Sequence, residues 1–186
     1  MFKLVELEGI VRIPPRAFGK PLKEVALKEL EERYVGMIDK RLGYVTAVVD
    51  VDINPVGRIL LGDGASYHKA AFTVLTFYPE LKEIIEGEVT DIMDFGAFVR
   101  LGPIDAILHV SQVMDDFITY DERTRTLIGK ETRRRLSVGD NIRVRITVVS
   151  FSARGAGKIG LTARQPFLGK AEWIRDDLKK LGGVNV

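Results

Sequence analysis

The chain has 186 residues, of which 46% are hydrophobic and 29% charged, a composition typical of folded globular proteins rather than disordered ones. The absence of cysteine excludes disulfides, zinc fingers, iron–sulfur clusters and thiol catalysis, and the two histidines leave little material for a histidine-rich metal centre. The 28 Lys and Arg residues nearly balance the 26 Asp and Glu residues, and the formal net charge of +2 is low for a nucleic-acid-binding protein.

The sequence gives no indication of a membrane segment. No apolar run approaches the roughly 20 residues that a spanning helix needs. The N-terminal stretch carries Glu6 and Glu8 among its apolar residues, which is not expected of a secretory signal. We therefore expect a cytoplasmic protein with no membrane partner.

The first residues predict a strand followed by a helix. Residues 1–13 mix apolar and polar residues in the manner of a strand and are followed by Pro14-Pro15. A helix is expected to begin at Pro21, because proline is well tolerated in a first helical turn, and to stop at Gly36. Its buried face is expected to comprise the apolar residues that recur at helical spacing, namely Leu22, Val25, Ala26, Leu30 and Tyr34.

Three further strands are expected before residue 80. They cover residues 42–53, 58–61 and 67–78, and Gly62-Asp63-Gly64 predicts a turn between the second and the third. The order β-α-β-β-β predicts an α+β domain over residues 1–80, with the helix on one face of its sheet.

The second half of the chain reads as mostly strand. Strands are expected at 84–93, 97–101, 105–109, 142–151 and 158–163, separated by glycine or proline. Five strands with glycine-marked bends over residues 81–166 predict an all-β barrel of the OB type. A long insert at about 114–137 is either functional or locally structured. Residues 167–186 form a tail in which a final helix is expected over 170–181.

The small net charge conceals an uneven distribution. Residues 1–80 carry 11 basic and 11 acidic residues, residues 81–122 carry 2 and 10, and residues 123–166 carry 11 and 2. Such asymmetry points to a charged partner surface in the second half of the chain. The total of +2 therefore excludes less than it first suggests.

One motif resembles the S1 RNA-binding domain over residues 81–166. The motif consists of Gly-Glu-Val-Thr-Asp-Ile-Met-Asp-Phe-Gly-Ala-Phe-Val at 87–99, Leu-His-Val-Ser-Gln at 108–112 and Val-Gly-Asp at 138–140. The resemblance implies that Phe95, Phe98 and His109 lie together on the outer barrel face, where aromatic rings stack on unpaired bases. The alternative is that both phenylalanines belong to the core and that the histidine is structural.

The basic stretch beyond residue 122 is a second candidate for RNA contact. Neutralisation of phosphates by basic side chains gives affinity that falls as salt rises, and arginine also stacks on bases. The candidates are Arg133, Arg134, Arg135, Arg143, Arg145 and Lys158. The alternative is that these residues pair with the acidic half of their own domain.

No catalytic, metal or cofactor site is expected. The acidic residues of the second domain, among them Asp91, Asp105 and Asp115, are scattered over different predicted elements, whereas two-metal catalysis needs converging carboxylates. Gly62-Asp63-Gly64-Ala65 lacks the Lys-Ser/Thr of a P-loop. Neither histidine lies in a recognisable nucleophile motif.

Over its whole length the chain resembles the E-prime family of archaeal DNA-directed RNA polymerase stalk proteins, the counterpart of the seventh-largest subunit of eukaryotic RNA polymerase II. The resemblance rests on Val-Arg-Ile-Pro-Pro at 11–15, Leu-Leu-Gly-Asp-Gly-Ala at 60–65, Tyr-Pro-Glu at 78–80 and Lys-Ile-Gly-Leu-Thr at 158–162, together with the S1 motif. It implies a non-catalytic stalk subunit that forms a heterodimer with the small F subunit of RNA polymerase. In that family an RNP-like tip domain docks on the polymerase core near the clamp, and the S1 domain meets single-stranded transcript.

Carried onto this sequence, the resemblance makes Gly62, Asp63, Gly64 and Ala65 candidates for core docking. An alternative function is an S1-domain RNA-processing factor of the exosome type or a translation accessory factor. The strands expected at 42–53 and 70–78 also carry apolar residues on both faces. Such strands are either buried on both sides within the chain or covered by another chain, and we favour the second interpretation.

Overall fold

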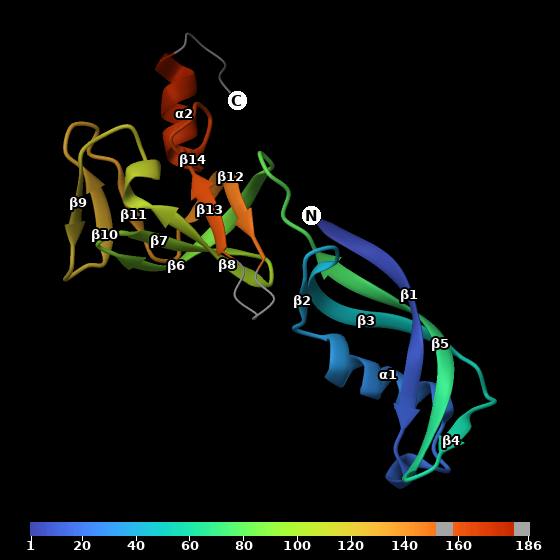
Figure 1. The fold of residues 1–186 in the computed structure, drawn as a ribbon. Helices are drawn as coiled ribbons and strands as arrows, with labels where there is room; N and C mark the ends of the chain where they lie inside the picture. The colour runs from blue at the N-terminus through green and yellow to red at the C-terminus, as the bar shows by residue number, and fades with distance from the viewer. Residues whose placement is uncertain (152–157, 181–186) are drawn as a thin grey trace. The chain divides into compact units, whose positions relative to one another are not determined.

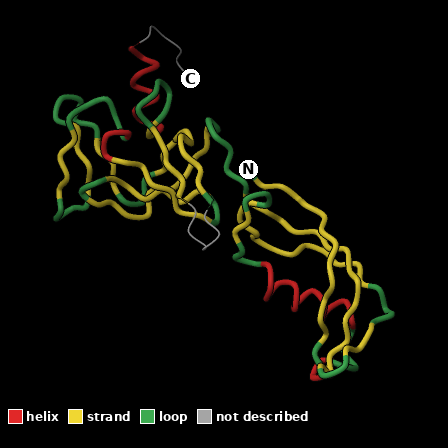
Figure 2. Tube along the Cα trace, in the orientation of Figure 1, coloured by secondary structure: helices red, strands yellow, loops and turns green. Residues whose placement is uncertain are grey.

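A computed structural model describes residues 1–151 and 158–180 of the chain. The described residues form two compact units, one comprising Met1–Tyr78 and the other containing Pro79–Ser150 and residues 158–180. Figures 1 and 2 show strands as the main element of both units. The described residues of each unit contain one α-helix. Each unit is described by itself below.

The N-terminal unit contains an antiparallel sheet with the strand order β1-β5-β3-β2, to which β4 adds by pairing with β5. The two longest strands pair in an unbroken register that runs from Phe2 opposite Phe77 to Ile13 opposite Ser66. The pairing of β3 with β5 contains two irregularities. The strands are β1 (Phe2–Ile13), β2 (Ile38–Asp39), β3 (Gly43–Ile53), β4 (Arg58–Leu60) and β5 (Asp63–Phe77).

Helix α1 (Leu22–Tyr34) covers one face of this sheet, after a short 3-10 turn η1 (Pro15–Ala17). Pro21 lies at the N-cap, one residue before the helix, and not within the first turn as the sequence predicts. Ala26 and Leu30 are buried against the sheet, in a core that includes the following strand residues: Val11, Val48, Val51, Phe72 and Val74. Complete burial of a leucine side chain contributes about 2–3 kcal/mol relative to its exposure, so the apolar stripe of the helix fixes it to the sheet.

The turn predicted at Gly62-Asp63-Gly64 lies one residue earlier than expected. Leu61 and Gly62 form the turn, whereas Asp63 and Gly64 already belong to β5. Asp63 pairs with Leu60 of β4, which leaves two residues for the hairpin loop. Gly62 has φ 90°, a conformation that glycine adopts without a steric penalty. The prediction of a turn at Asp63 and Gly64 was therefore wrong.

The second unit is built around a six-stranded sheet with the order β13-β8-β7-β6-β12-β14. An additional pairing of β12 with β13 closes five of these strands into a barrel, as the sequence predicts. The interior contains Val89, Ile92, Val99, Leu108 and Val144, each at most 1% exposed. The strands are β6 (Ile84–Met93), β7 (Gly96–Leu101), β8 (Ile104–His109), β12 (Asn141–Ser150), β13 (Lys158–Thr162) and β14 (Gly169–Lys170).

The predicted insert is locally structured. After a 3-10 turn η2 (Val110–Gln112), it forms a three-stranded sheet with β10 (Thr126–Gly129) between β9 (Ile118–Asp121) and β11 (Arg135–Ser137). Leu127 and Leu136 pair across this sheet and are fully buried. The insert therefore has a small core of its own.

The predicted C-terminal helix is present as α2 (Ala171–Lys180) among the described residues. Its Trp173 is 5% exposed. The Arg134 guanidinium lies 5.6 Å from the centre of the Trp173 ring and also pairs with Asp177. One arginine of the insert thus binds the helix by both a cation–π contact and an ion pair.

Candidate nucleic-acid interface and docking surfaces

The two phenylalanines of the S1-like motif lie together at one end of β7. Their ring centres are 6.1 Å apart and their planes are nearly perpendicular, at 89°. Phe95 is 43% exposed and Phe98 is half-buried. A Cβ on Gly96, between them, would lie 2.3 Å from the backbone oxygen of Leu108. Only glycine therefore allows β7 and β8 to approach closely enough to place both rings on the outer surface.

Strand pairing adds two residues to this surface. Phe98 lies opposite Ile107, and Gly96 lies opposite His109. Since side chains alternate along a strand, Ile107 and His109 share the outward face of β8 while Leu108 points into the barrel, where it is fully buried. Ile107 was missed in the sequence, although its alternation with buried neighbours could have identified it.

We name the surface formed by Phe95, Phe98, Ile107 and His109 the aromatic face. His109 has a structural role within it, because its Nδ1 accepts a hydrogen bond from the Ser111 backbone N–H at 3.2 Å and so caps η2. The Ser111 hydroxyl lies 2.8 Å from the same nitrogen. The neutral ring therefore carries its hydrogen on Nε2, while its side chain remains exposed.

The insert brings a positive charge to the aromatic face. Asp91 lies opposite Phe98 in the β6–β7 pair, and an Arg125 guanidinium nitrogen lies 3.3 Å from an Asp91 carboxylate oxygen. The Tyr120 hydroxyl donates to the Ile92 backbone oxygen at 3.5 Å, which further ties β9 to β6. Arg125 belongs to the basic stretch identified in the sequence, but only folding pairs it with Asp91, the residue opposite Phe98.

The selected basic residues are not gathered at the aromatic face. Arg134 is bound to α2, and an Arg143 guanidinium nitrogen lies 2.8 Å from a Glu86 carboxylate oxygen. Arg133 and Arg135 are exposed in the insert. The half-buried side chain of Arg145 has an Nε atom without a hydrogen-bond partner among the described residues.

Lys158 begins β13 and is exposed opposite Ser150. Since Gly160 pairs with Ile107 of β8, Lys158 lies on a strand next to the aromatic face. Arg164 pairs with Asp115 through hydrogen bonds. Several arginines thus pair with acids of their own unit, which was the alternative interpretation of the basic stretch.

Several acidic residues of this unit have structural partners. Asp105 pairs with Arg100 at 3.0 Å. Asp116 accepts hydrogen bonds from the backbone N–H groups of Glu131 and Thr132, and the latter lowers the pKa of its carboxyl most strongly. Within residues 1–151 and 158–180 no group of three or more acidic or histidine residues is placed to hold a metal ion.

The predicted docking residues of the N-terminal unit lie beside an exposed apolar loop. Ile59 is 70% exposed and Leu61 is fully exposed. Of the residues selected from the sequence, Gly62 lies in the turn itself, whereas Ala65 is fully buried. We name Ile59, Leu60 and Leu61 the β4–β5 loop residues. Their apolar character is visible in the sequence. Their exposure is not, because it results from the fold, in which β4 pairs with β5 alone among the described strands.

An ion pair anchors this hairpin to β1. The Arg12 guanidinium donates two hydrogen bonds of 2.8 Å to the Asp63 carboxylate, and the Tyr67 hydroxyl donates another of 2.5 Å. Chiefly because of the Arg12 hydrogen bonds, the pKa of the Asp63 carboxyl lies well below its usual range. The two sequence segments Val-Arg-Ile-Pro-Pro and Leu-Leu-Gly-Asp-Gly-Ala therefore meet at one end of the sheet.

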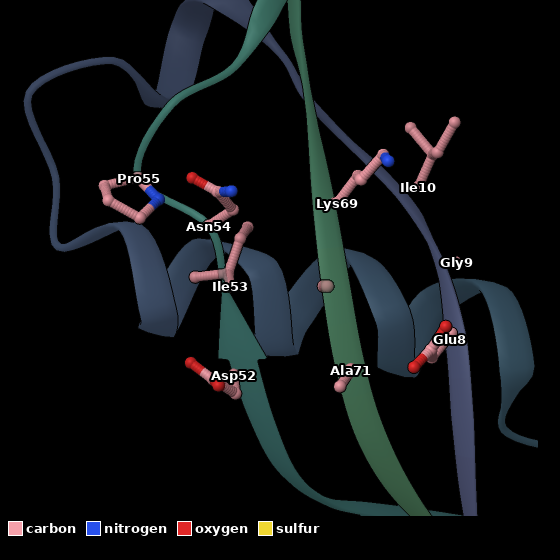
Figure 3. Close-up of a pocket in the computed structure, with 10 residues that line it drawn as sticks. Glu8, Gly9, Ile10, Asp52, Ile53, Asn54, Pro55, Lys69 and Ala71 are labelled. Carbon is pink, nitrogen blue, oxygen red and sulfur yellow. The ribbon is translucent and has the colours of Figure 1, made fainter.

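The sheet face opposite α1 contains a groove of about 690 Å³ lined by β1, β3 and β5. Figure 3 shows Glu8 on β1 and Asp52 on β3 on either side of Ala71 on β5. Elsewhere on this face Leu4 pairs with the half-buried Leu75. The expected two-sided apolar character of the strands is therefore limited to part of the face, because the groove is also lined by the charged residues Glu8, Asp52 and Lys69.

No helix of the described residues is long and apolar enough to cross a membrane.

Two family models match the chain. The model of the S1 RNA binding domain matches residues 78–156, and that of the "SHS2 domain found in N terminus of Rpb7p/Rpc25p/MJ0397" matches residues 8–64. DNA-directed RNA polymerase subunit Rpo7 of Saccharolobus shibatae is 43% identical over 94% of this chain and 97% of its own length. The Rpo7 subunit of Saccharolobus solfataricus is 42% identical over 96% of this chain and all of its own length. The RNA polymerase III subunit RPC8 of Bos taurus is 29% identical over 81% of this chain and 77% of its own length.

Proposed function

Because the chain belongs to the DNA-directed RNA polymerase subunit Rpo7 family, we propose that it is the non-catalytic stalk subunit of an archaeal RNA polymerase. In this role it forms a heterodimer with the small F subunit, docks on the polymerase core near the clamp and binds emerging single-stranded RNA in the cytoplasm. The observation that carries the proposal is the nearly full-length match to Rpo7 subunits, which spans both units. The exosome-type and translation-factor alternatives share with the chain only its S1 domain.

RNA binding by the aromatic face follows from its chemistry. Phe95 and Phe98 offer ring faces in two perpendicular planes, on which unpaired bases stack at about 1–3 kcal/mol per base. The exposed Nε2–H of His109 is a donor for a base or phosphate oxygen. Lys158 on β13 supplies positive charge for the phosphates, and Arg125 would add to it on leaving its partner Asp91. Arg133, Arg135 and Arg145 extend the candidate set; Arg134 and Arg143 would first have to leave their acidic partners.

Docking on the core is assigned to the end of the N-terminal unit that holds the β4–β5 loop residues and Gly62. Exposed apolar side chains at the tip of a hairpin gain free energy when a partner protein covers them. Asp63 and Gly64 support this loop from β5, where Arg12 holds the aspartate. Buried Ala65 contributes packing beneath the loop rather than a contact with the core.

RNA titration of the purified chain tests the aromatic face. Replacing both Phe95 and Phe98 by alanine is expected to weaken binding of single-stranded RNA by about tenfold or more, since at least one stacked base is lost. Fluorescence anisotropy at several salt concentrations measures the affinity, and circular dichroism checks the fold. The control is Phe117→Ala, which removes a 74% exposed phenylalanine of the insert. Equal affinity of the double variant and the control would refute RNA stacking at this face.

Reconstitution tests the subunit assignment. The chain is expected to co-purify with polymerase core and a small F-like partner. Substitution of Leu61 by Asp is expected to weaken the core interaction without affecting RNA binding by the free chain, because it places an uncompensated charge in an apolar contact. Magnesium-dependent RNA degradation by the purified chain would instead support the RNA-processing alternative.

A further inference from the structure

The outer surface of the barrel carries an apolar row that crosses four neighbouring strands. Phe98 on β7 lies opposite Ile107 on β8, and Ile107 lies beside Gly160 on β13. Gly160 in turn lies opposite Val148 on β12. Ile107 is 36% exposed and Val148 is 54% exposed. The row therefore continues the aromatic face by two strands, from β8 across β13 to β12.

A β-bulge turns Val148 toward the solvent. The register of β12 with β13 shifts between Ile146 and Val148, so that Thr147 is an extra residue in β12. In a regular strand the residue two places after the buried Ile146 would also point into the barrel. The bulge instead places an apolar, β-branched side chain on the outer surface. Bulges are frequent beside functional sites, where they redirect a side chain in this way.

Gly160 leaves an open floor between Ile107 and Val148. A Cβ on Gly160 would lie 3.2 Å from the Cβ of Val148, so Val148 leans over β13 where that strand has no side chain. The Thr147 hydroxyl donates a hydrogen bond of 3.0 Å to the Gly160 backbone oxygen. The floor is therefore a bare peptide unit whose oxygen already accepts a hydrogen bond. A flat ring can approach such a unit closely, because no side chain has to be displaced.

A row of charged residues borders the apolar row. Arg100 lies opposite Asp105 in the β7–β8 pair and forms an ion pair with it at 3.0 Å. Strands β8 and β13 are parallel, with Ile107 beside Gly160, so Lys158 lies beside Asp105, two residues back along both strands. Lys158 is exposed and has no ion pair among the described residues. Two residues along a strand span roughly 6.6 Å, which is about the reach from a nucleotide's base to its own phosphate.

This surface fits a nucleotide better than a protein segment. Closure of the barrel leaves no free strand edge among β7, β8, β13 and β12 to which an extended peptide could add. A cation without an acidic partner, placed beside a flat apolar floor, matches a planar base that carries a phosphate. Neighbouring strands are about 4.8 Å apart, so Phe98 and Gly160 are separated by roughly 10 Å. Successive bases of one extended strand reach both positions.

We propose that Gly160 and Val148 form a further base subsite for single-stranded RNA, next to the aromatic face. The base lies on the Gly160 peptide between Ile107 and Val148, and its phosphate contacts Lys158. The RNA therefore crosses the barrel strands from β7 to β12 instead of running along one of them. The subsite rests on the proposed binding of RNA by the aromatic face, to which it adds one base and one phosphate.

The first experiment enlarges the side chain at the end of the row. In the full chain, Val148→Phe supplies another stacking ring and is expected to tighten binding of a short oligouridylate about fivefold, measured by fluorescence anisotropy. Gly160→Ala covers the floor with a methyl group and is expected to weaken binding about threefold. The control is Val49→Phe, because Val49 is also 54% exposed and lies at an irregularity of the β3–β5 pair in the N-terminal unit. This control is expected to bind RNA as the unchanged chain does.

The second experiment distinguishes a base from a phosphate at this position. The full chain, labelled at its valine and isoleucine methyl groups, is titrated with the oligouridylate and with an abasic strand of the same length. A base over Gly160 shifts the Val148 and Ile107 methyl signals through its ring current, and the abasic strand is expected to leave both signals nearly unchanged. Equal shifts with the two strands, or no shift of Val148 with saturating oligouridylate, would overturn the subsite.

The outcomes separate this subsite from the aromatic face itself. If Phe95 and Phe98 are needed for RNA binding but Val148→Phe and Val49→Phe bind alike, the subsite is overturned and the aromatic face stands. If the unchanged chain does not bind the oligouridylate, both are overturned. Tighter binding by Val148→Phe alone, together with a base-dependent Val148 shift, supports the subsite.

Discussion

The sheets of the two units end in different ways, and the difference determines what each can bind. In the second unit β12 pairs with both β6 and β13, and β13 pairs with β8, so that the sheet closes on itself. Closure satisfies the backbone of these strands, so the barrel presents side chains, such as those of the aromatic face, to a partner. The N-terminal sheet remains open at β1, where the backbone itself is available.

Charge is also organised differently in the two units. Residues 1–80 are neutral overall, and the acidic residues of β1 remain unpaired within the described residues. In the second unit the acidic segment 81–122 and the basic segment 123–166 pair with each other through Arg125–Asp91, Arg143–Glu86 and Arg164–Asp115. Much of the charge asymmetry of the sequence is thus neutralised by folding, and fewer basic residues remain available for the proposed RNA binding.

The largest effect is expected where the barrel depends on close strand approach. Gly96→Ala would place a methyl group against the Leu108 backbone oxygen and is expected to destabilise the second unit by about 4 kcal/mol. Gly62→Ala is the control, because Gly62 also has positive φ but has nothing within 4 Å of the added carbon; it is expected to cost only about 1–2 kcal/mol. Limited proteolysis at increasing urea concentrations measures the unfolding of each unit separately. Equal resistance of the two variants would contradict the proposed clash.

The open sheet depends instead on its covering helix. Leu30→Ala leaves a cavity between α1 and the sheet and is expected to destabilise the N-terminal unit by about 2–5 kcal/mol. Urea unfolding followed by proteolysis is expected to show earlier cleavage in the N-terminal unit and unchanged resistance of the barrel. Glu31→Ala on the exposed side of the same helix is expected to change stability by no more than about 0.5 kcal/mol. Simultaneous loss of both units would show that they do not unfold independently.

A smaller effect is expected where the insert binds α2. Arg134→Ala removes the ion pair with Asp177 and the contact with Trp173 and is expected to cost about 2 kcal/mol. Because Trp173 is the only tryptophan, its fluorescence reports the change directly and is expected to shift to longer wavelength as the ring becomes hydrated. Arg134→Lys is expected to restore little of this lost stability, since a lysine ammonium lacks the planar surface with which the Arg134 guanidinium stacks on Trp173. An unchanged emission spectrum in Arg134→Ala would contradict this role.

The smallest effect at neutral pH is expected at the β4–β5 hairpin. The pKa of Asp63 is lowered in the folded chain, so the Arg12 pair stabilises the fold above the ordinary aspartate pKa of about 3.9. This stabilisation is lost as pH falls below that value toward the folded pKa. Asp63→Asn is therefore expected to flatten the dependence of the melting temperature on pH in this acidic range.

Most elements were predictable from local pattern, and the failures have physical causes. The stripe from Leu22 to Tyr34 predicted α1 because helical periodicity is a property of adjacent turns. The glycines at 62 and 64 suggested one wide turn, but cross-strand pairing recruited Asp63 into β5 and left a two-residue loop. The three strands of the insert were not resolved in the sequence because their buried residues are few and their pairing partners define them.

The sequence by itself determined the α+β and barrel classes, the family and the aromatic residues of the S1-like motif, because each depends on residue type and local spacing. Only the tertiary structure decided which charges stay available, since arginines adjacent in the sequence find different acids in space. It likewise paired Arg125 with Asp91, buried Ala65 beneath the loop and left β1 at the edge of its sheet. These outcomes depend on pairing between distant segments, which no local pattern encodes.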